Sequence, residues 1–229
     1  MSIWSRIGEA ITSLIARGEQ LSSFFLGPKT PPERSVAFTI AVVGLGAKMA
    51  KADGQVKTSE VAAFRRVFRI SASEEAAAAR VFNLARQDIA GFDVYAGRIA
   101  SMFRDRPRIL EDILEGLFHI AMADGHYHEN EEGFLRRVAE IFGISEAAFS
   151  AIEARQLTGP DSDPWQVLGV SRDAKLPEIR KHWRDLIREN HPDVMIARGL
   201  PSESITLATA RITAINRAWD EIKARNEAA

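Results

Sequence analysis

The chain carries, at residues 176–193, the stretch LPEIRKHWRDLIRENHPD, in which a basic amphipathic segment leads directly into His191-Pro192-Asp193. Pro192 has no backbone N–H and a fixed φ, so it cannot lie inside a helix, and it favours extended geometry at His191. The stretch therefore predicts a helix that stops near Asn190. An imidazole and a carboxylate are then left on a short, stiff connection, which is a suitable place for recognition of a partner.

The two faces of this predicted helix differ in character, as expected for an amphipathic helix. One face is apolar and carries Ile179, Trp183, Leu186 and Ile187. The other face is basic and carries Arg180, Lys181, Arg184 and Arg188. A basic row is usually only a solvated helix face. Because this row leads into His191-Pro192-Asp193, we favour a docking surface for a partner.

Two further helices are predicted around this segment. Asp163-Pro164 reads as an N-cap followed by a proline at the first helical position, and Gly169 reads as the end of one short apolar helix. After the basic helix, residues 203–225 place apolar side chains at alternating steps of four and three, namely Ala208, Ile212, Ile215, Trp219 and Ile222. That spacing is typical of the seam of an antiparallel helix pair.

In their order and spacing, these segments resemble the J domain of the Hsp40/DnaJ co-chaperones over residues 163–225. The resemblance is carried by DPWQVLGV at 163–170, IRKHWRDL at 179–186, HPD at 191–193 and INRAW at 215–219. It implies a partner rather than a reaction catalysed by this chain, because J domains bind an Hsp70 in its ATP state and stimulate its ATP hydrolysis. We therefore expect a protein that is not an enzyme and needs no cofactor.

The same resemblance implies which residues would contact a DnaK-type Hsp70. Asp193 would pair with an arginine of the Hsp70, and the basic face would lie against an acidic Hsp70 surface. Trp183 stands where the family usually has tyrosine. The full expected set is His191, Pro192, Asp193, Arg180, Lys181, Trp183, Arg184 and Arg188.

Three positions depart from the common pattern of the family. Asp185 stands at a position that is commonly basic, His182 replaces a small residue that packs inward, and Val194 replaces a frequent lysine. We expect these changes to tune affinity or the choice of Hsp70 without removing the signal. A Gly/Phe-rich linker and a cysteine-based zinc region are also missing, so any targeting falls to the residues upstream.

Upstream, residues 33–157 show helical periodicity broken by short turns, and strand-like alternation is hard to find. We therefore expect an all-α protein. An internal repeat lies here at a spacing of 71 residues, because Ala50-Lys51-Ala52-Asp53-Gly54 aligns with Ala121-Met122-Ala123-Asp124-Gly125. Each copy reads as a buried helix, an Asp-Gly turn and a helix with an Arg pair on its outer side.

These repeats, with the long loop at 194–201, resemble the DjlA-type J proteins, in which a TerB-like helical domain precedes a C-terminal J domain. We expect an amphipathic helix and linker at 1–32, a TerB-like helical bundle at 33–157 and a J domain at 158–229 with its core at 163–225. The last boundary falls in LTGPDSDP, where Gly, Pro and small polar residues cluster. The N-terminal domain would then provide targeting, or client or ion binding.

TerB-like domains carry clustered acids that are thought to bind divalent cations, and the matching residues are Asp53, Glu60, Asp124 and Glu131. Their Asp-to-Glu step of seven does not fit an EF-hand loop. Asp-Gly is also a natural turn, and a Glu in the next helix's first turn favours its dipole, so we prefer a structural role. An ion-binding stress-response module with a secondary J-like tail stays open as the alternative function.

Three histidines near Asp124, namely His119, His126 and His128, raise the question of a transition-metal site and a metal-dependent hydrolase. No His-Glu-x-x-His pattern accompanies them, and His126 and His128 fall on a predicted exposed turn. We therefore expect surface histidines and no metal there.

Composition excludes several other classes. The chain has 229 residues, a net charge of −1 and no cysteine, which leaves no pull toward nucleic acid and no disulfide or thiolate metal site. Residues 3–26 predict a helix with one apolar stripe, but its polar face is not rich in Lys or Arg, so we favour packing on protein over contact with lipid. Without a signal-like or membrane-spanning stretch, we expect a cytoplasmic protein, with peripheral contact at the inner membrane as the less favoured alternative.

Overall fold

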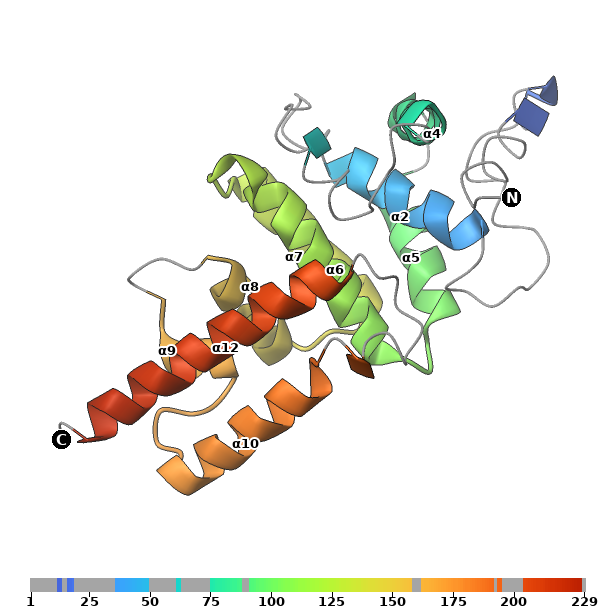
Figure 1. The fold of residues 1–229 in the computed structure, drawn as a ribbon. Helices are drawn as coiled ribbons and strands as arrows, with labels where there is room; N and C mark the ends of the chain where they lie inside the picture. The colour runs from blue at the N-terminus through green and yellow to red at the C-terminus, as the bar shows by residue number, and fades with distance from the viewer. Residues whose placement is uncertain are drawn as a thin grey trace. The chain divides into compact units, whose positions relative to one another are not determined.

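The computed structural model describes residues 12–13, 16–18, 36–49, 61–62, 75–87, 91–157, 162–191, 193–194 and 204–227. Every regular element within these ranges is a helix (Figure 1), which confirms the predicted all-α class. The chain divides into two compact units, Met1–Gly143 and Ile144–Ala229. The predicted helix at 3–26, and the Asp-Gly turn and second helix of the first repeat copy, lie almost wholly outside the described residues.

Each unit is a small set of helices. In the first unit the described elements are α2 (Val36–Met49), α4 (Glu75–Gln87), α5 (Phe92–Met102), α6 (Pro107–Ala121), the 3-10 turn η3 (Met122–Asp124) and α7 (Glu129–Phe142). In the second unit they are α8 (Glu146–Gln156), α9 (Pro164–Leu168), α10 (Leu176–Glu189) and α12 (Ser204–Glu227).

Helix α2 is buried on most sides, as expected for a helix whose single charged residue, Lys48, lies in its last turn. Ile40, Val43 and Leu45 are inaccessible to solvent, and the helix packs against α4 and α5. Gly44 faces the buried ring of Tyr95 on α5, and a Cβ added at this glycine would lie 2.5 Å from Cδ1 of that ring and closer still to Cε1. The missing side chain therefore sets how closely the two helices approach. Of the described helices, α2 included, none has the length and apolar content that crossing a membrane requires.

The second copy of the repeat folds as predicted. Helix α6 begins with Pro107 in its first turn, and the Asp124-Gly125 turn follows it, with Gly125 at φ 82°. Helix α7 comes next and carries the exposed Arg137, whose Nε lies 3.3 Å from Oδ1 of Asp93 on α5. The rings of Phe92 and Phe134 join the same two helices, with centroids 4.4 Å apart.

In the second unit, α10 and α12 run antiparallel and side by side (Figure 1). Asp163 caps α9 by accepting a hydrogen bond from the backbone N–H of Trp165 at 3.2 Å, and Gly169 ends it at φ 69°, both as predicted. Helices α10 and α12 also match their predicted spans closely. Their buried faces meet in one core made of Ala154, Val167, Leu168, Ile179, Ile215, Ala218 and Ile222.

Helix α8 packs within this second unit. Ala154 contributes to its core, and the Arg155 guanidinium donates to the carbonyl of Val167 on α9 at 3.4 Å. Gly169, at the end of α9, lies next to the Cβ of Ala151. The domain boundary that composition predicts between residues 157 and 158 stays a prediction. The packing adds that α8 shares its core with the helices that follow it.

Candidate functional site

The loop that follows α10 presents its two charged or ionisable side chains to solvent. The side chains of His191 and Asp193 are 53% and 86% exposed. The loop is held by its own hydrogen bonds, since Val194 N–H donates to the His191 carbonyl at 2.9 Å and Asp193 N–H donates to His191 Nδ1 at 3.3 Å. Pro192 lies outside the described residues.

These bonds also orient the imidazole of His191. Nδ1 accepts the Asp193 N–H, so in the neutral ring the proton is on Nε2. The nearer carboxylate oxygen of Asp193, Oδ2, lies 3.6 Å from the same Nδ1. The loop thus offers a partner one N–H donor from the ring and one acidic acceptor, both at the end of a helix.

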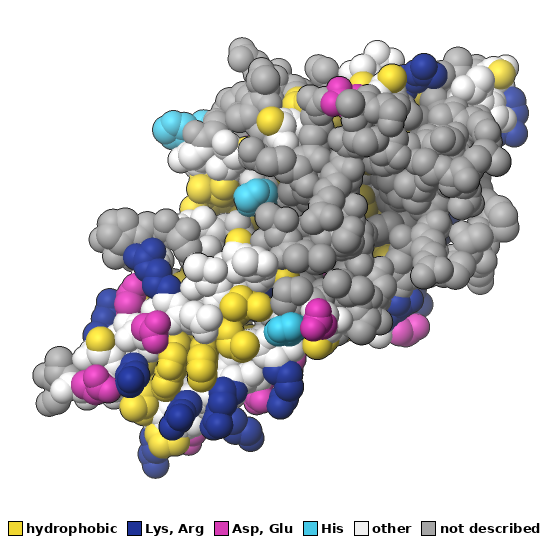
Figure 2. All heavy atoms as spheres, viewed as in Figure 1, with side chains coloured by type: hydrophobic (Ala, Val, Ile, Leu, Met, Phe, Trp, Pro, Cys, Tyr) yellow, Lys and Arg dark blue, Asp and Glu magenta, His cyan; other side chains and the backbone are white. Residues whose placement is uncertain are grey.

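The predicted basic face of α10 is exposed at Arg180, Lys181, Arg184 and Arg188. Figure 2 shows Lys and Arg side chains gathered over α10, beside a band of hydrophobic side chains. Arg188 is partly engaged by its own helix, because its Nη2 lies 2.7 Å from Oδ1 of Asp185. This pair connects the positively charged row to the acidic residue that departs from the family pattern.

Trp183 is half-buried between α10 and α12 and does not lie on the outward row. Its ring stacks on Trp219, and its indole N–H donates to Oδ1 of Asn216 at 3.0 Å. The side chain therefore holds the helix pair together, and its predicted contact with an Hsp70 stays a prediction.

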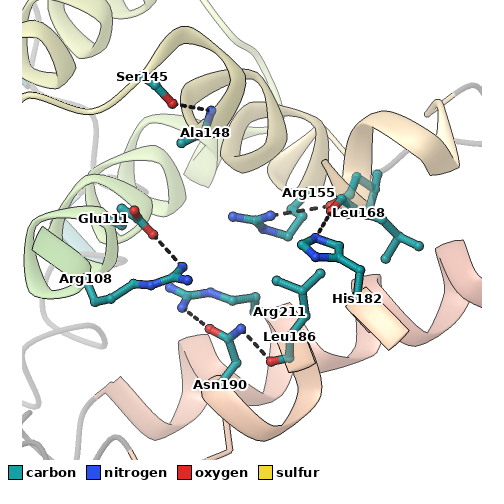
Figure 3. Close-up of polar contacts among 11 residues, drawn as sticks. Arg108, Glu111, Ser145, Ala148, Arg155, Leu168, His182, Leu186, Asn190 and Arg211 are labelled. Carbon is teal, nitrogen blue, oxygen red and sulfur yellow. Dashed lines mark hydrogen bonds and ion pairs between the residues drawn. The ribbon is translucent and has the colours of Figure 1, made fainter. Parts of the chain in front are cut away.

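His182, the second departure, faces the end of α9. Its Nε2 lies 3.0 Å from the carbonyl oxygen of Leu168, as Figure 3 shows, and a carbonyl can only accept, so the ring donates. The last carbonyls of a helix lack partners within it. An imidazole at this position supplies one, which a small inward-facing residue could not do.

A polar pair that the periodicity analysis did not identify lies at the base of the loop. Asn190, which ends α10, accepts a hydrogen bond from Nη1 of Arg211 on α12, and both residues are 8% exposed. The sequence signal for this pair is the position of Arg211, which has the helical spacing of the buried residues Ala208, Ile215 and Ala218. An arginine in a buried stripe requires a polar partner.

Of the four acidic residues of the possible ion site, Glu131 has a structural role. Glu131 is 2% exposed and its Oε2 accepts the backbone N–H of His128 at 3.0 Å, which completes a capping box at the start of α7. Asp124 lies in η3, and Asp53 and Glu60 fall outside the described residues. Across the described ranges, no group of three or more His, Cys, Asp or Glu side chains is placed to hold a metal. The ion site stays a prediction.

The three histidines near this turn are spread out. His126 and His128 are exposed, as expected, and their ring centroids are 6.2 Å apart. His119 is half-buried on α6.

Family models match both parts of the chain. The model described as tellurite resistance protein TerB matches residues 39–154, and the DnaJ domain matches residues 163–227. The chain belongs to the J-domain proteins of the DjlA type, in which a TerB-like helical domain precedes a J domain.

Curated relatives agree along nearly the whole length. The co-chaperone protein DjlA of Photobacterium profundum is 26% identical in a match that covers 91% of this chain and 85% of that protein. DjlA of Aliivibrio fischeri is 28% identical, and the match covers 88% of this chain and 83% of that protein. DjlA of Escherichia coli is 25% identical, with 83% and 80% covered. No solved structure matches this chain.

Proposed function

We propose that this protein is a co-chaperone that binds a DnaK-type Hsp70 through its J domain and stimulates the ATP hydrolysis of that partner. The observation that carries the proposal is the exposed loop of His191 and Asp193 at the end of a helix with a basic outer face. The protein itself catalyses no reaction in this proposal. Its contribution is to dock on the Hsp70 and to favour the hydrolysing state.

The exposed side chains of the loop and of the basic face have different roles in this proposal. The side chain of Asp193 is 86% exposed, so a partner can reach its carboxylate. In the complex it pairs with an arginine of the Hsp70 in a charge-assisted contact. The row of Arg180, Arg184 and Arg188 faces an acidic surface and speeds encounter more than it adds affinity. Loss of the docked carboxylate should therefore affect the complex far more than loss of one charge in the row.

The TerB-like domain supplies targeting, or client or ion binding, in the same proposal. The partner is a cytoplasmic Hsp70, and we place the protein in the cytoplasm. Contact of residues 1–32 with the inner membrane is the less favoured alternative. No contact with nucleic acid is proposed, because the net charge is −1.

The test is single-turnover ATP hydrolysis by the host Hsp70 with saturating full-length chain. The wild-type protein should accelerate hydrolysis, and His191→Gln should lose the acceleration. His126→Gln is the matched control, because it makes the same change at an exposed histidine of the first unit. If wild type and His191→Gln behave alike, the proposed function is wrong.

A further inference from the structure

Asn190 directly precedes His191 and lies at the base of the exposed loop. Asn190 ends α10 with φ −98° and ψ 8°. Its Nδ2 donates to the carbonyl of Leu186 at 2.7 Å, and its Oδ1 accepts from Nη1 of Arg211 at 2.5 Å, as Figure 3 shows. Arg211 belongs to α12, so this one side chain ties the end of one helix to the middle of another.

The chemistry of the two partners defines the residue needed between them. A carbonyl only accepts and a guanidinium only donates, so the side chain at 190 must donate at one end and accept at the other. A neutral amide does both. A carboxylate would set an oxygen against the Leu186 carbonyl, and an apolar side chain would offer nothing to Arg211.

The contact lies in a setting where hydrogen bonds are strong. Asn190 and Arg211 are each 8% exposed, so water competes little for the bond. A buried guanidinium needs acceptors for its N–H groups, and Asn190 Oδ1 supplies one of them to Arg211. Asn190 is also linked directly to the loop, because His191 is the next residue in the chain.

We infer that Asn190 and Arg211 form a clamp that positions the His191–Asp193 loop on the α10–α12 pair for its action on the Hsp70. The inference rests on the proposed function and adds positioning residues to it. Within the described residues the hydrogen bonds of the loop itself are short-range: Asp193 and Val194 donate to His191, and the His191 N–H donates to the Arg188 carbonyl at 3.5 Å. The clamp connects this local turn to the helix across from it.

The test uses the full-length chain and two measurements. The first is amide hydrogen exchange at Asp193 and Val194, which requires no Hsp70. The second is stimulated ATP hydrolysis by the Hsp70 as a function of chain concentration, which separates the maximal rate from the half-saturating concentration. Arg211→Met removes the donor, and Arg211→Lys keeps a shorter one. Arg217→Met is the control, because this exposed arginine of α12 pairs with Glu221.

In Arg211→Met we expect the two loop amides to exchange about tenfold faster, the size typical for loss of a hydrogen bond to a charged group. The amides of Ile179 and Ile215 should keep their rates. The maximal rate of stimulated ATP hydrolysis should also fall about tenfold. The half-saturating concentration should change little, because the basic face is intact. Arg211→Lys should recover most of both losses, and Arg217→Met should match wild type.

Unchanged exchange at Asp193 and Val194 in Arg211→Met would overturn the clamp. Exchange that rises equally across α10 and α12 would also overturn it, because that result describes a purely structural residue. If the wild-type chain fails to stimulate the Hsp70, the proposed function is wrong, and the exchange measurement alone then decides whether the loop is held by Arg211.

Discussion

The rings of Trp183 and Trp219 stack across the seam between α10 and α12, with centroids 5.3 Å apart and planes inclined by 15°. The indole N–H of Trp183 donates to Asn216 on the same partner helix. The tryptophan that replaces the family's tyrosine therefore joins the two helices that carry the functional loop, in addition to any contact it makes with an Hsp70.

This contact predicts a graded loss of stability. Trp183→Phe keeps an aromatic ring and loses the hydrogen bond to Asn216, and should lower the opening free energy of the helix pair by about 1 kcal/mol. Trp183→Ala also loses the packing, and should lower it by about 3 kcal/mol. Native-state hydrogen exchange at Ile179 and Ile215 measures both values. Equal losses in the two variants would show that stacking contributes nothing.

Asp185 pairs with Arg188 and lowers the net positive charge of the basic face. Removal of this negative charge should therefore strengthen docking on the Hsp70. Asp185→Asn raises the charge of this face by one, so the half-saturating concentration of the chain in the Hsp70 assay should fall about threefold at low salt, as expected for steering by charge. The gain should shrink near 1 M salt, where the screening length is about 3 Å.

Asp220→Asn is the matched control for this prediction, because it makes the same charge change at an exposed position of α12. An equal gain in Asp220→Asn would assign the effect to net charge and not to the outer face of α10.

Gly44 should be intolerant of the smallest substitution. Gly44→Ala forces a methyl group into the buried ring of Tyr95 and should destabilise the first unit by about 1–3 kcal/mol. Gly97→Ala on α5 meets no atom within 4 Å and should instead stabilise by about 0.5–1 kcal/mol, because alanine is the better helix former. Amide exchange in α2 and α5 gives both values. Opposite signs are expected, and a neutral Gly44→Ala would contradict the close approach.

Glu131 separates the capping role from an ion site. Glu131→Gln keeps the side-chain oxygen that accepts from His128 and removes the charge, so the stability of α7 should stay within about 0.5 kcal/mol. Glu131→Ala should cost about 1 kcal/mol, as loss of a cap does. Calorimetric titration of the full chain with calcium and magnesium checks the alternative. Heat that is present in wild type and lost in Glu131→Gln would assign a cation to this residue.

Helix α8 should be needed for full stability of the J domain. A fragment of residues 144–229 keeps Ala154 and Arg155 against α9, and a fragment of residues 158–229 lacks them. The longer fragment should be more stable by about 2 kcal/mol in urea denaturation, within the range for loss of buried packing and one hydrogen bond. Equal midpoints and slopes would show that α8 adds nothing to this core.

Much of the second unit could be predicted because its signals are local. The cap at Asp163, the stop at Gly169 and the end of α10 before Pro192 each depend on residues within one helical turn. The exposure of His191 follows from the same reasoning. The membership of α8 could not be predicted, because a linker of small polar residues marks where the chain is irregular and not which core the preceding helix joins.

The sequence by itself determined that this is an all-helical chain with an imidazole and a carboxylate on a short turn after a basic helix, since helix periodicity and proline geometry act over a few residues. Only the tertiary structure decided what holds that turn. Asn190 and Arg211 are 21 residues apart. Their contact, like that of Trp183 with Trp219, depends on the register in which α10 and α12 pack, and that register is a property of the whole core.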